Sequence, residues 1–383
     1  MSATARQPTP ATSANAKAAK PGKGGGRRLW FDLHSWVGLK LCLFMGFICL
    51  TGTLAVFAAE IDWLLHPQMR VTPTDQHASW GTLVAAAQRA HPDWVLEGLR
   101  APHASHFAAK AQMRRPDGRR RFVWIDPYSG QVTGDTHWFS AHRLLRNTHR
   151  HLMIPTKYGV PLVAALSLPL LLSLLSSLYI YKRWWRGFFS WPRADRPRRL
   201  WGDVHRLLGV WSLWFVALIA LTGGWYLIES LGGKAPPQRD IALPEPGPAA
   251  PADAAAIDRA VATLGAQWPA LEIRGVEVSP DGGALVLDGQ AQAWLVRDRA
   301  NVAGIDLRDG RLLGRHEGGE LGVHQRISEM ADPLHFGSFG GWPVRLLWFL
   351  FGAALTALSF TGVYLYGLRV ADALRSAQRR RPA

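Results

Sequence analysis

The chain has 383 residues, of which 48% are hydrophobic, and a formal net charge of +16 at pH 7. This length would allow one large soluble domain or two small ones, but the apolar residues gather in stretches long enough to cross a bilayer as helices, about 20 residues each. The basic residues do not interleave with aromatic residues on a soluble surface. This argues against nucleic-acid binding.

Four apolar stretches are expected to span the membrane. They cover residues 33–58, 159–181, 207–228 and 342–368. Basic residues crowd the N-terminal tail, the segment after the second stretch and the C-terminus, which are on one side of a four-span chain. The positive-inside rule therefore places both termini and the middle loop in the cytoplasm, and the protein in the inner membrane of a bacterium.

The chain is predicted to alternate between membrane helices and outer domains. In order, the segments are a disordered cytoplasmic tail (1–28), membrane helix one (29–59), a periplasmic domain (60–140), membrane helix two (141–183), a basic cytoplasmic loop (184–203), membrane helix three (204–229), a second periplasmic domain (230–332), membrane helix four (333–369) and a cytoplasmic tail (370–383). The first apolar stretch is longer than the core of a signal peptide, which favours an uncleaved anchor.

Each outer domain is predicted to be a small α+β unit. Helical patterns at 79–90 and 254–264 precede strand-like runs, and turn sequences rich in Asp and Gly follow at 126–130 and 304–311. One of the strand-like runs in the second domain is 293–296. The common order of elements suggests that the two domains are diverged copies of one unit.

The repeat continues into the membrane helices, which indicates an internal duplication. The first span carries Asp-x-His-x-x-x-Gly at 32–38 and a Thr-Gly pair at 51–52, and the third carries the same pattern at 203–209 and 222–223. In both, the threonine follows the histidine by 17 residues. The fold class expected is therefore a four-helix membrane bundle with two periplasmic α+β domains.

The even spans also resemble each other. His149 precedes Ser176-Ser177 by 27 residues, and His335 precedes Thr361-Gly362 by 26 residues. Small residues let membrane helices approach closely, so the Thr-Gly pairs are predicted to be helix-packing contacts. Gly38 and Gly209, one turn after the histidines of the odd spans, are predicted to let a flat ring approach the helix backbone.

Four histidines are the leading candidates for a site, because an ionisable residue in the membrane is costly without a function or a partner. His34 and His205 begin the outward-running spans, so both are expected near the cytoplasmic face. His149 and His335 precede the inward-running spans and are expected near the outer face. Haem iron takes axial nitrogen ligands on both sides, and facing helices commonly supply them. Each pair is therefore predicted to bind one haem b, and two haems with both axial positions filled form an electron carrier.

The residues leave alternatives open. A histidine at a helix start is often only a cap, and a duplication would preserve a cap equally well. His142, two turns before His149, is the alternative ligand, and His151 is another. Arg150 and Arg206 lie near the proposed haem ends and are candidates for pairing with haem propionates or for anchoring the helices in lipid headgroups.

These motifs resemble those of the PepSY-associated transmembrane family over about residues 28–370. The matching segments are 32–38 with 51–52, 203–209 with 222–223, 149–152, 334–341, and the outer turns 122–132 and 304–310. The sequence departs from the pattern at Leu307-Arg308, where the first unit has Pro127-Tyr128, and at Ser176-Ser177. The resemblance implies an inner-membrane ferric-siderophore reductase with two b haems. Reducing hard Fe³⁺ to softer Fe²⁺ weakens its binding by oxygen ligands and frees the metal.

The electron donor is expected to be external, because no Gly-x-Gly-x-x-Gly motif follows a strand and no cytoplasmic segment is long enough for a nucleotide domain. A quinol or a separate cytoplasmic reductase would serve, and the sequence does not choose between them. Two other classes compete: a haem-free permease for iron complexes, and a regulatory or scaffold protein that binds a partner. The apparent lack of broken helices makes the permease less favoured.

Overall fold

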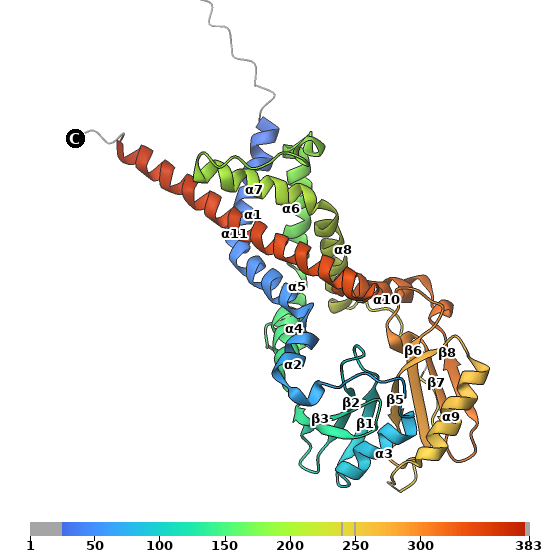
Figure 1. Cartoon of the computed structure of the whole chain (residues 1–383). Helices are drawn as coiled ribbons and strands as arrows, with labels where there is room; N and C mark the ends of the chain where they lie inside the picture. Colours follow the sequence, from blue (N-terminus) through green and yellow to red (C-terminus); the bar gives the residue numbers. More distant parts are fainter. Residues whose placement is uncertain (1–24, 239, 249, 380–383) are drawn as a thin grey trace, which may run out of the picture.

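The computed structural model describes residues 25–238, 240–248 and 250–379, and the side chains of all of these except residues 25, 27 and 36–41. Figure 1 shows a helical part with a large sheet at one end of it. Most of the predicted tail at 1–28 lies outside the described residues. Its last four residues do not belong to a tail, because the first helix already begins at Gly25.

The described residues contain eleven α-helices. Two of them, α3 and α9, lie on the sheet, and the others form the helical part. They are α1 (Gly25–Ala55), α2 (Ala58–Leu65), α3 (Trp80–Ala90), α4 (Ala141–His151), α5 (Thr156–Ala164), α6 (Ser167–Ile180), α7 (Pro197–Trp211), α8 (Leu213–Ser230), α9 (Ala254–Gln267), α10 (Val323–Phe336) and α11 (Gly341–Arg379).

Three helical segments are long and apolar enough to cross a membrane: Thr156–Ile180, Leu213–Ser230 and Gly341–Arg379. The pair Cys42–Ala55 and Ala58–Leu65 is a fourth candidate, but it bends by 62° at its break. The expectation of unbroken spans is therefore wrong.

The second predicted span divides into α4, α5 and α6, and the fourth divides into α10 and α11. The breaks have local causes. Leu152 and Met153 adopt positive φ after α4, and Gly337 does the same after α10. Between α5 and α6, Pro169 has no N–H to donate to the preceding turn, and the helical hydrogen bonding there is irregular.

The strands form one antiparallel sheet in the order β4-β3-β2-β1-β5-β6-β7-β8. Their bounds are β1 (Val95–Arg100), β2 (Ala109–Arg114), β3 (Arg120–Ile125), β4 (Val132–His137), β5 (Glu272–Val278), β6 (Ala284–Gln290), β7 (Val302–Asp306) and β8 (Leu312–His316). The two predicted outer domains thus share one sheet, joined where β1 pairs with β5. The run 293–296, predicted as a strand, lies in a loop between β6 and β7.

One face of this sheet is covered by α3 and α9, which lie side by side across the joint. The apolar residues between these two helices and the sheet form one buried cluster. It includes Leu99, Ile125, Leu285 and Ile305 of the strands. Full burial of such a side chain stabilises the fold by about 1.5–3 kcal/mol, so the cluster fixes the two halves to each other. The opposite face of the sheet is left to carry polar and aromatic residues next to the helical part.

The side chain of Arg345 connects the helical part to the sheet. Arg345 of α11 donates to both carboxylate oxygens of Glu60 in α2, at 2.6 Å each, and to the carbonyl oxygen of Val56. It also contacts His103, in the loop between β1 and β2, at 2.9 Å. One guanidinium thus holds three segments, including the bend between α1 and α2.

Replacing Arg345 by methionine is expected to lower the free energy of unfolding by up to about 3 kcal/mol, the lower end of the cost of breaking a buried ion pair. The lower end applies because the Glu60 side chain keeps 26% of its exposure. Thermal unfolding of the purified protein in detergent measures this loss. The double variant that adds Glu60→Gln should recover part of it, and equal loss in both variants would contradict the prediction.

Candidate functional site

The structure brings His149 and His335 together, from helices α4 and α10 in the two halves of the chain. Their ring centroids are 6.1 Å apart and the ring planes are tilted by 42°. We call these two residues the sheet-side pair, because α4 and α10 lie at the end of the helical part next to the sheet.

His34 of α1 and His205 of α7 form the far-side pair. They lie close enough to interact electrostatically, and α7 lies at the end of the helical part that points away from the sheet (Figure 1). Each pair therefore joins a helix from the first half of the chain to a helix from the second half. This is the pairing that the duplicated motifs predict.

Each of the four imidazoles has a hydrogen-bond partner at Nδ1 on a neighbouring helix. His34 contacts the Ser176 hydroxyl at 2.9 Å, and His205 contacts the Thr361 hydroxyl at 2.8 Å. His335 contacts the Thr222 hydroxyl at 2.8 Å. The Nδ1 atom of His149 lies 2.9 Å from the carbonyl oxygen of Ile48.

The partner of His149 fixes which of its ring nitrogens carries the proton. A carbonyl oxygen only accepts, so Nδ1 of His149 must donate. The hydroxyls of Ser176, Thr222 and Thr361 also lie 3.0, 2.8 and 2.7 Å from helix carbonyls, and a hydroxyl that gives its proton to a carbonyl accepts from the histidine. A neutral imidazole that donates from Nδ1 presents its lone pair at Nε2.

The Thr-Gly and Ser-Ser positions therefore do more than pack helices, which corrects the prediction. Ser176, Thr222 and Thr361 orient histidines across the helix interface. The sequence carried a signal for this role, because these hydroxyl residues recur at matched distances from the histidines in the duplicated frame. In contrast, the carbonyl of Ile48 could not be identified from a side-chain pattern.

Gly52 serves the sheet-side pair by its lack of a side chain. A Cβ atom at this position would lie 2.5 Å from Cε1 and 2.8 Å from Nδ1 of His149. At Gly362 a Cβ atom would meet His205 Cε1 at an ordinary 3.7 Å, and at Gly209 only Leu358 at 3.8 Å. The surroundings of Gly38 lie outside the described side chains. Of Gly52, Gly209 and Gly362, Gly52 alone has a histidine too close for a Cβ atom.

The alternative ligands lie elsewhere. His142 is exposed and lines a cavity beside Asp62, whose carboxylate accepts from the His142 backbone N–H at 3.3 Å. His151 contacts the carbonyl oxygen of Ile154 at 2.7 Å. Neither faces another histidine among the described residues, so the geometry favours His149 as the partner of His335.

The two arginines predicted near haem propionates are both exposed. Arg206 forms an ion pair with Asp203, which Arg193 also contacts at 2.8 Å. An arginine already paired with a carboxylate is a weaker candidate for binding a propionate. Arg150 forms no ion pair with the described residues, so its role stays a prediction.

A haem fits this arrangement better than a bare metal ion does. Among the described residues, no group of three or more His, Cys, Asp or Glu side chains is placed to hold a metal ion. Haem iron needs only two protein ligands. Each histidine pair offers two imidazoles, each with a hydrogen bond at Nδ1 of the kind that orients metal-bound imidazoles.

The comparisons with known proteins agree with the sequence motifs. An uncharacterized protein of Pseudomonas aeruginosa is 28% identical over 255 residues, which cover 60% of this chain and 64% of that protein. The chain therefore matches a little less than two thirds of this relative's length. The PepSY-associated TM region family matches residues 22–369. Because this match spans almost the whole chain, the protein belongs to the PepSY-associated TM region family.

Proposed function

We propose that this protein crosses the inner membrane of a bacterium four times and carries electrons through two b haems to a ferric siderophore or a similar ferric complex. The large sheet lies in the periplasm in this proposal, and both termini lie in the cytoplasm. The charge distribution supports this orientation, because basic residues crowd the segments on the side away from the sheet.

The observation that carries the proposal is the common hydrogen-bonding pattern of four histidines. Each has a partner on a neighbouring helix at Nδ1, which leaves Nε2 as the nitrogen that would bind a metal. Histidines that merely cap helices would have no reason to share this pattern. Those that bind a metal usually do share it, since the outer hydrogen bond fixes the ring.

His34 and His205 would hold one haem, and His149 and His335 would hold the other. When bound with both axial positions filled by protein, such a group supplies one-electron transfer rather than oxygen binding. The chain itself supplies orientation. Thr222 fixes the His335 ring, and the Tyr226 ring packs against the same imidazole with its centroid 5.3 Å away. The Tyr226 hydroxyl donates to Asp332 at 2.7 Å.

The electron donor would be a quinol or a cytoplasmic reductase, which would deliver electrons at the far-side pair. Reducing the purified protein with a soluble quinol analogue, or with a flavin reductase and nicotinamide, separates the two. The donor that reduces the protein faster than it reduces a control without the protein's haems identifies the class of electron donor.

The direct test of the proposal is the spectrum of the purified full chain. Dithionite is expected to produce the sharp reduced bands of haem b with two histidine ligands, at two haems per chain. A colourless protein, grown with excess haem precursor, would overturn the proposal. The second candidate is a haem-free permease, which the 62° bend in the first candidate span favours, because transporters use discontinuous helices.

Removing one orienting hydroxyl should weaken haem binding without abolishing it. Thr222→Val takes the acceptor from His335 Nδ1, and losses of such outer hydrogen bonds cost about 10–100-fold in metal affinity. Haem retained after dialysis against apomyoglobin measures the effect. Thr356→Val is the matched control, because Thr356 bonds only the Gly352 carbonyl of its own helix. Equal retention in the two variants would contradict the prediction.

A further inference from the structure

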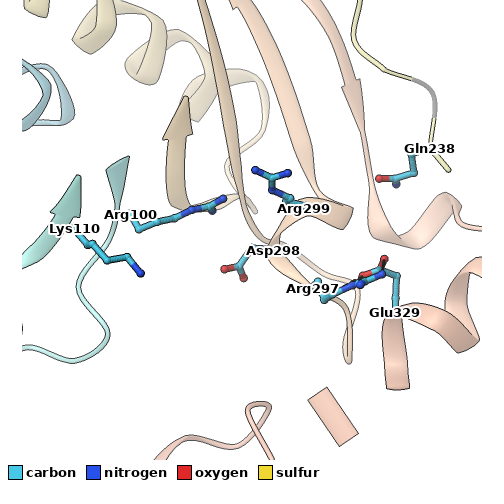
Figure 2. A pocket seen from close by; sticks show the side chains of 7 residues that line it. All are labelled: Arg100, Lys110, Gln238, Arg297, Asp298, Arg299 and Glu329. Carbon is cyan, nitrogen blue, oxygen red and sulfur yellow. Dashed lines mark hydrogen bonds and ion pairs between the residues drawn. The ribbon is translucent and has the colours of Figure 1, made fainter. Parts of the chain in front are cut away.

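Two cavities lie along the face of the sheet that α3 and α9 leave uncovered. The first, of about 570 Å³, is lined by residues from both halves of the chain. Figure 2 shows Arg100 and Lys110 reaching toward Asp298 and Arg299 of the other half. The second, of about 320 Å³, shares Arg100 and Lys110 and continues to α4. We refer to the two together as the crevice; each is of a size that holds small ligands.

The crevice is cationic. Six basic side chains line it against three acidic ones. The basic side chains are Arg100, Lys110, Arg143, Arg146, Arg297 and Arg299. Most of the cations in the first cavity already have acidic partners: Arg100 pairs with Asp288, Arg299 pairs with Glu277, and Arg297 contacts Glu329 at 2.6 Å. These ion pairs form part of the lining of the first cavity, and their cations are already neutralised.

Lys110 and Arg143 form no ion pair with any described residue. Burial lowers the pKa of the Lys110 ammonium, and the nearby guanidiniums of Arg100 and Arg143 lower it further, whereas Asp62 opposes them. Asp62 is not in contact with the ammonium. The buried Nε of Arg143 has no hydrogen-bond partner. A buried donor without a partner is costly, so the Arg143 guanidinium is ready for an anion, and the Lys110 ammonium adds a second positive charge that no carboxylate of the described residues pairs with.

Both free cations lie around one aromatic surface. The Lys110 ammonium and the Arg143 guanidinium are 5.1 and 5.9 Å from the centroid of Phe122. The Arg143 guanidinium also stacks on Trp138 at 3.3 Å. The lining of the second cavity therefore combines positive charge with the aromatic side chains of Phe107, Phe122 and Trp124, which suits an aromatic anion better than an aliphatic neutral ligand.

We propose that the crevice binds an anionic, aromatic metal chelate of the catecholate class, with Lys110 and Arg143 as its anchoring cations. This rests on the proposed function and names the class of its acceptor. Catecholate oxygens are hard donors suited to Fe³⁺, and a ferric tris-catecholate complex keeps a net negative charge. A tris-hydroxamate complex of the same metal is neutral.

The position of the crevice suits electron delivery. Asn147 lines it, two residues before His149 on α4. Arg146, also in its lining, lies close enough to Asp332 and Tyr226 to interact with them electrostatically. Tyr226 packs on His335. The crevice lining and the sheet-side pair therefore both include residues of α4.

The test measures binding to the purified full chain in detergent by isothermal titration calorimetry. Gallium(III) tris-catecholate is the probe, and gallium(III) tris-hydroxamate is the neutral comparison. Gallium is not reduced under these conditions, so binding does not depend on electron transfer. We expect the catecholate to bind at least about tenfold more tightly, and Lys110→Gln or Arg143→Gln to weaken it by about ten- to hundredfold, the value of a charged hydrogen bond.

Two further variants make the result decisive. Lys110→Arg should keep most of the affinity, and Arg119→Gln, on the exposed turn between β2 and β3, should keep all of it. Equal affinity for the two chelates, no catecholate binding, or equal loss in Arg119→Gln would overturn the proposal. The preference of the unaltered protein decides the matter if a variant fails to fold. The haem spectrum of the same sample reports separately on the proposed electron transfer.

Discussion

His335→Ala is expected to keep one haem of the two and to lose electron transfer to acceptors on the side of the sheet. The imidazole of His335 is the partner of His149 across 6.1 Å, and one remaining histidine does not hold the group with both axial positions filled. The far-side pair has its own hydroxyl partners, Ser176 and Thr361, so it should remain loaded. Haem per chain, from the pyridine haemochrome assay, measures the loss.

The control is His324→Ala, on the same helix α10. His324 contacts the Gly233 carbonyl at 3.2 Å and should be replaceable with no loss of haem. The complementary variant His34→Ala should lose the other haem and keep reduction of the sheet-side one by dithionite. Two haems retained in His335→Ala would refute the pairing. Loss of both haems in His335→Ala but not in His34→Ala would mean that the two sites form in order.

The sequence was sufficient to predict which histidines belong together, because the duplicated frame fixes their depth. His34 and His205 occupy the same place in two copies of one motif, as do His149 and His335. The helices on the sheet were also predicted close to their observed bounds: 79–90 became α3, and 254–264 became most of α9. The histidine pairs and these two helices were predictable because each depends on a sequence pattern within one short stretch of the chain.

The union of the two outer domains could not be predicted in this way. It depends on β1, where Leu99 pairs with Val276 and Arg100 pairs with Gly275. The strand contains Gly98 and the charged Glu97 and Arg100, so its sequence lacks the apolar alternation of a half-buried strand. Its pairing edge is set by the other half of the chain, about 175 residues away in sequence.

The breaks in the membrane helices were missed for a related reason. Hydropathy reports how much of a stretch is apolar, but not whether its backbone continues as one helix. Pro169 was visible, yet proline is tolerated in membrane helices. Leu152 adopts a positive φ although leucine does not favour one, so its residue type gave no sign of the break. The helices α4 and α10 end at these breaks, shortly after His149 and His335.

Gly52→Ala is expected to remove the sheet-side haem, whereas Gly362→Ala is expected to keep both haems. Both glycines follow a threonine in a Thr-Gly pair, one in the first span and one in the fourth, and they differ in what a methyl group would meet. At Gly52 it would lie 2.5 Å from His149 Cε1, and at Gly362 it would lie 3.7 Å from the nearest atoms. Because Gly52 lies within α1, the helix backbone cannot move away without losing its hydrogen bonds.

The His149 ring must therefore rotate out and give up its bond to the Ile48 carbonyl, which leaves that site with one axial ligand. Haem per chain and the thermal midpoint together distinguish this from general unfolding. One haem with a nearly unchanged midpoint is the expected result for Gly52→Ala. Two haems in both variants would show that His149 can bind from another rotamer. Equal loss of haem in both variants would show that the small residues of these helices serve only helix packing, as expected for Thr-Gly pairs.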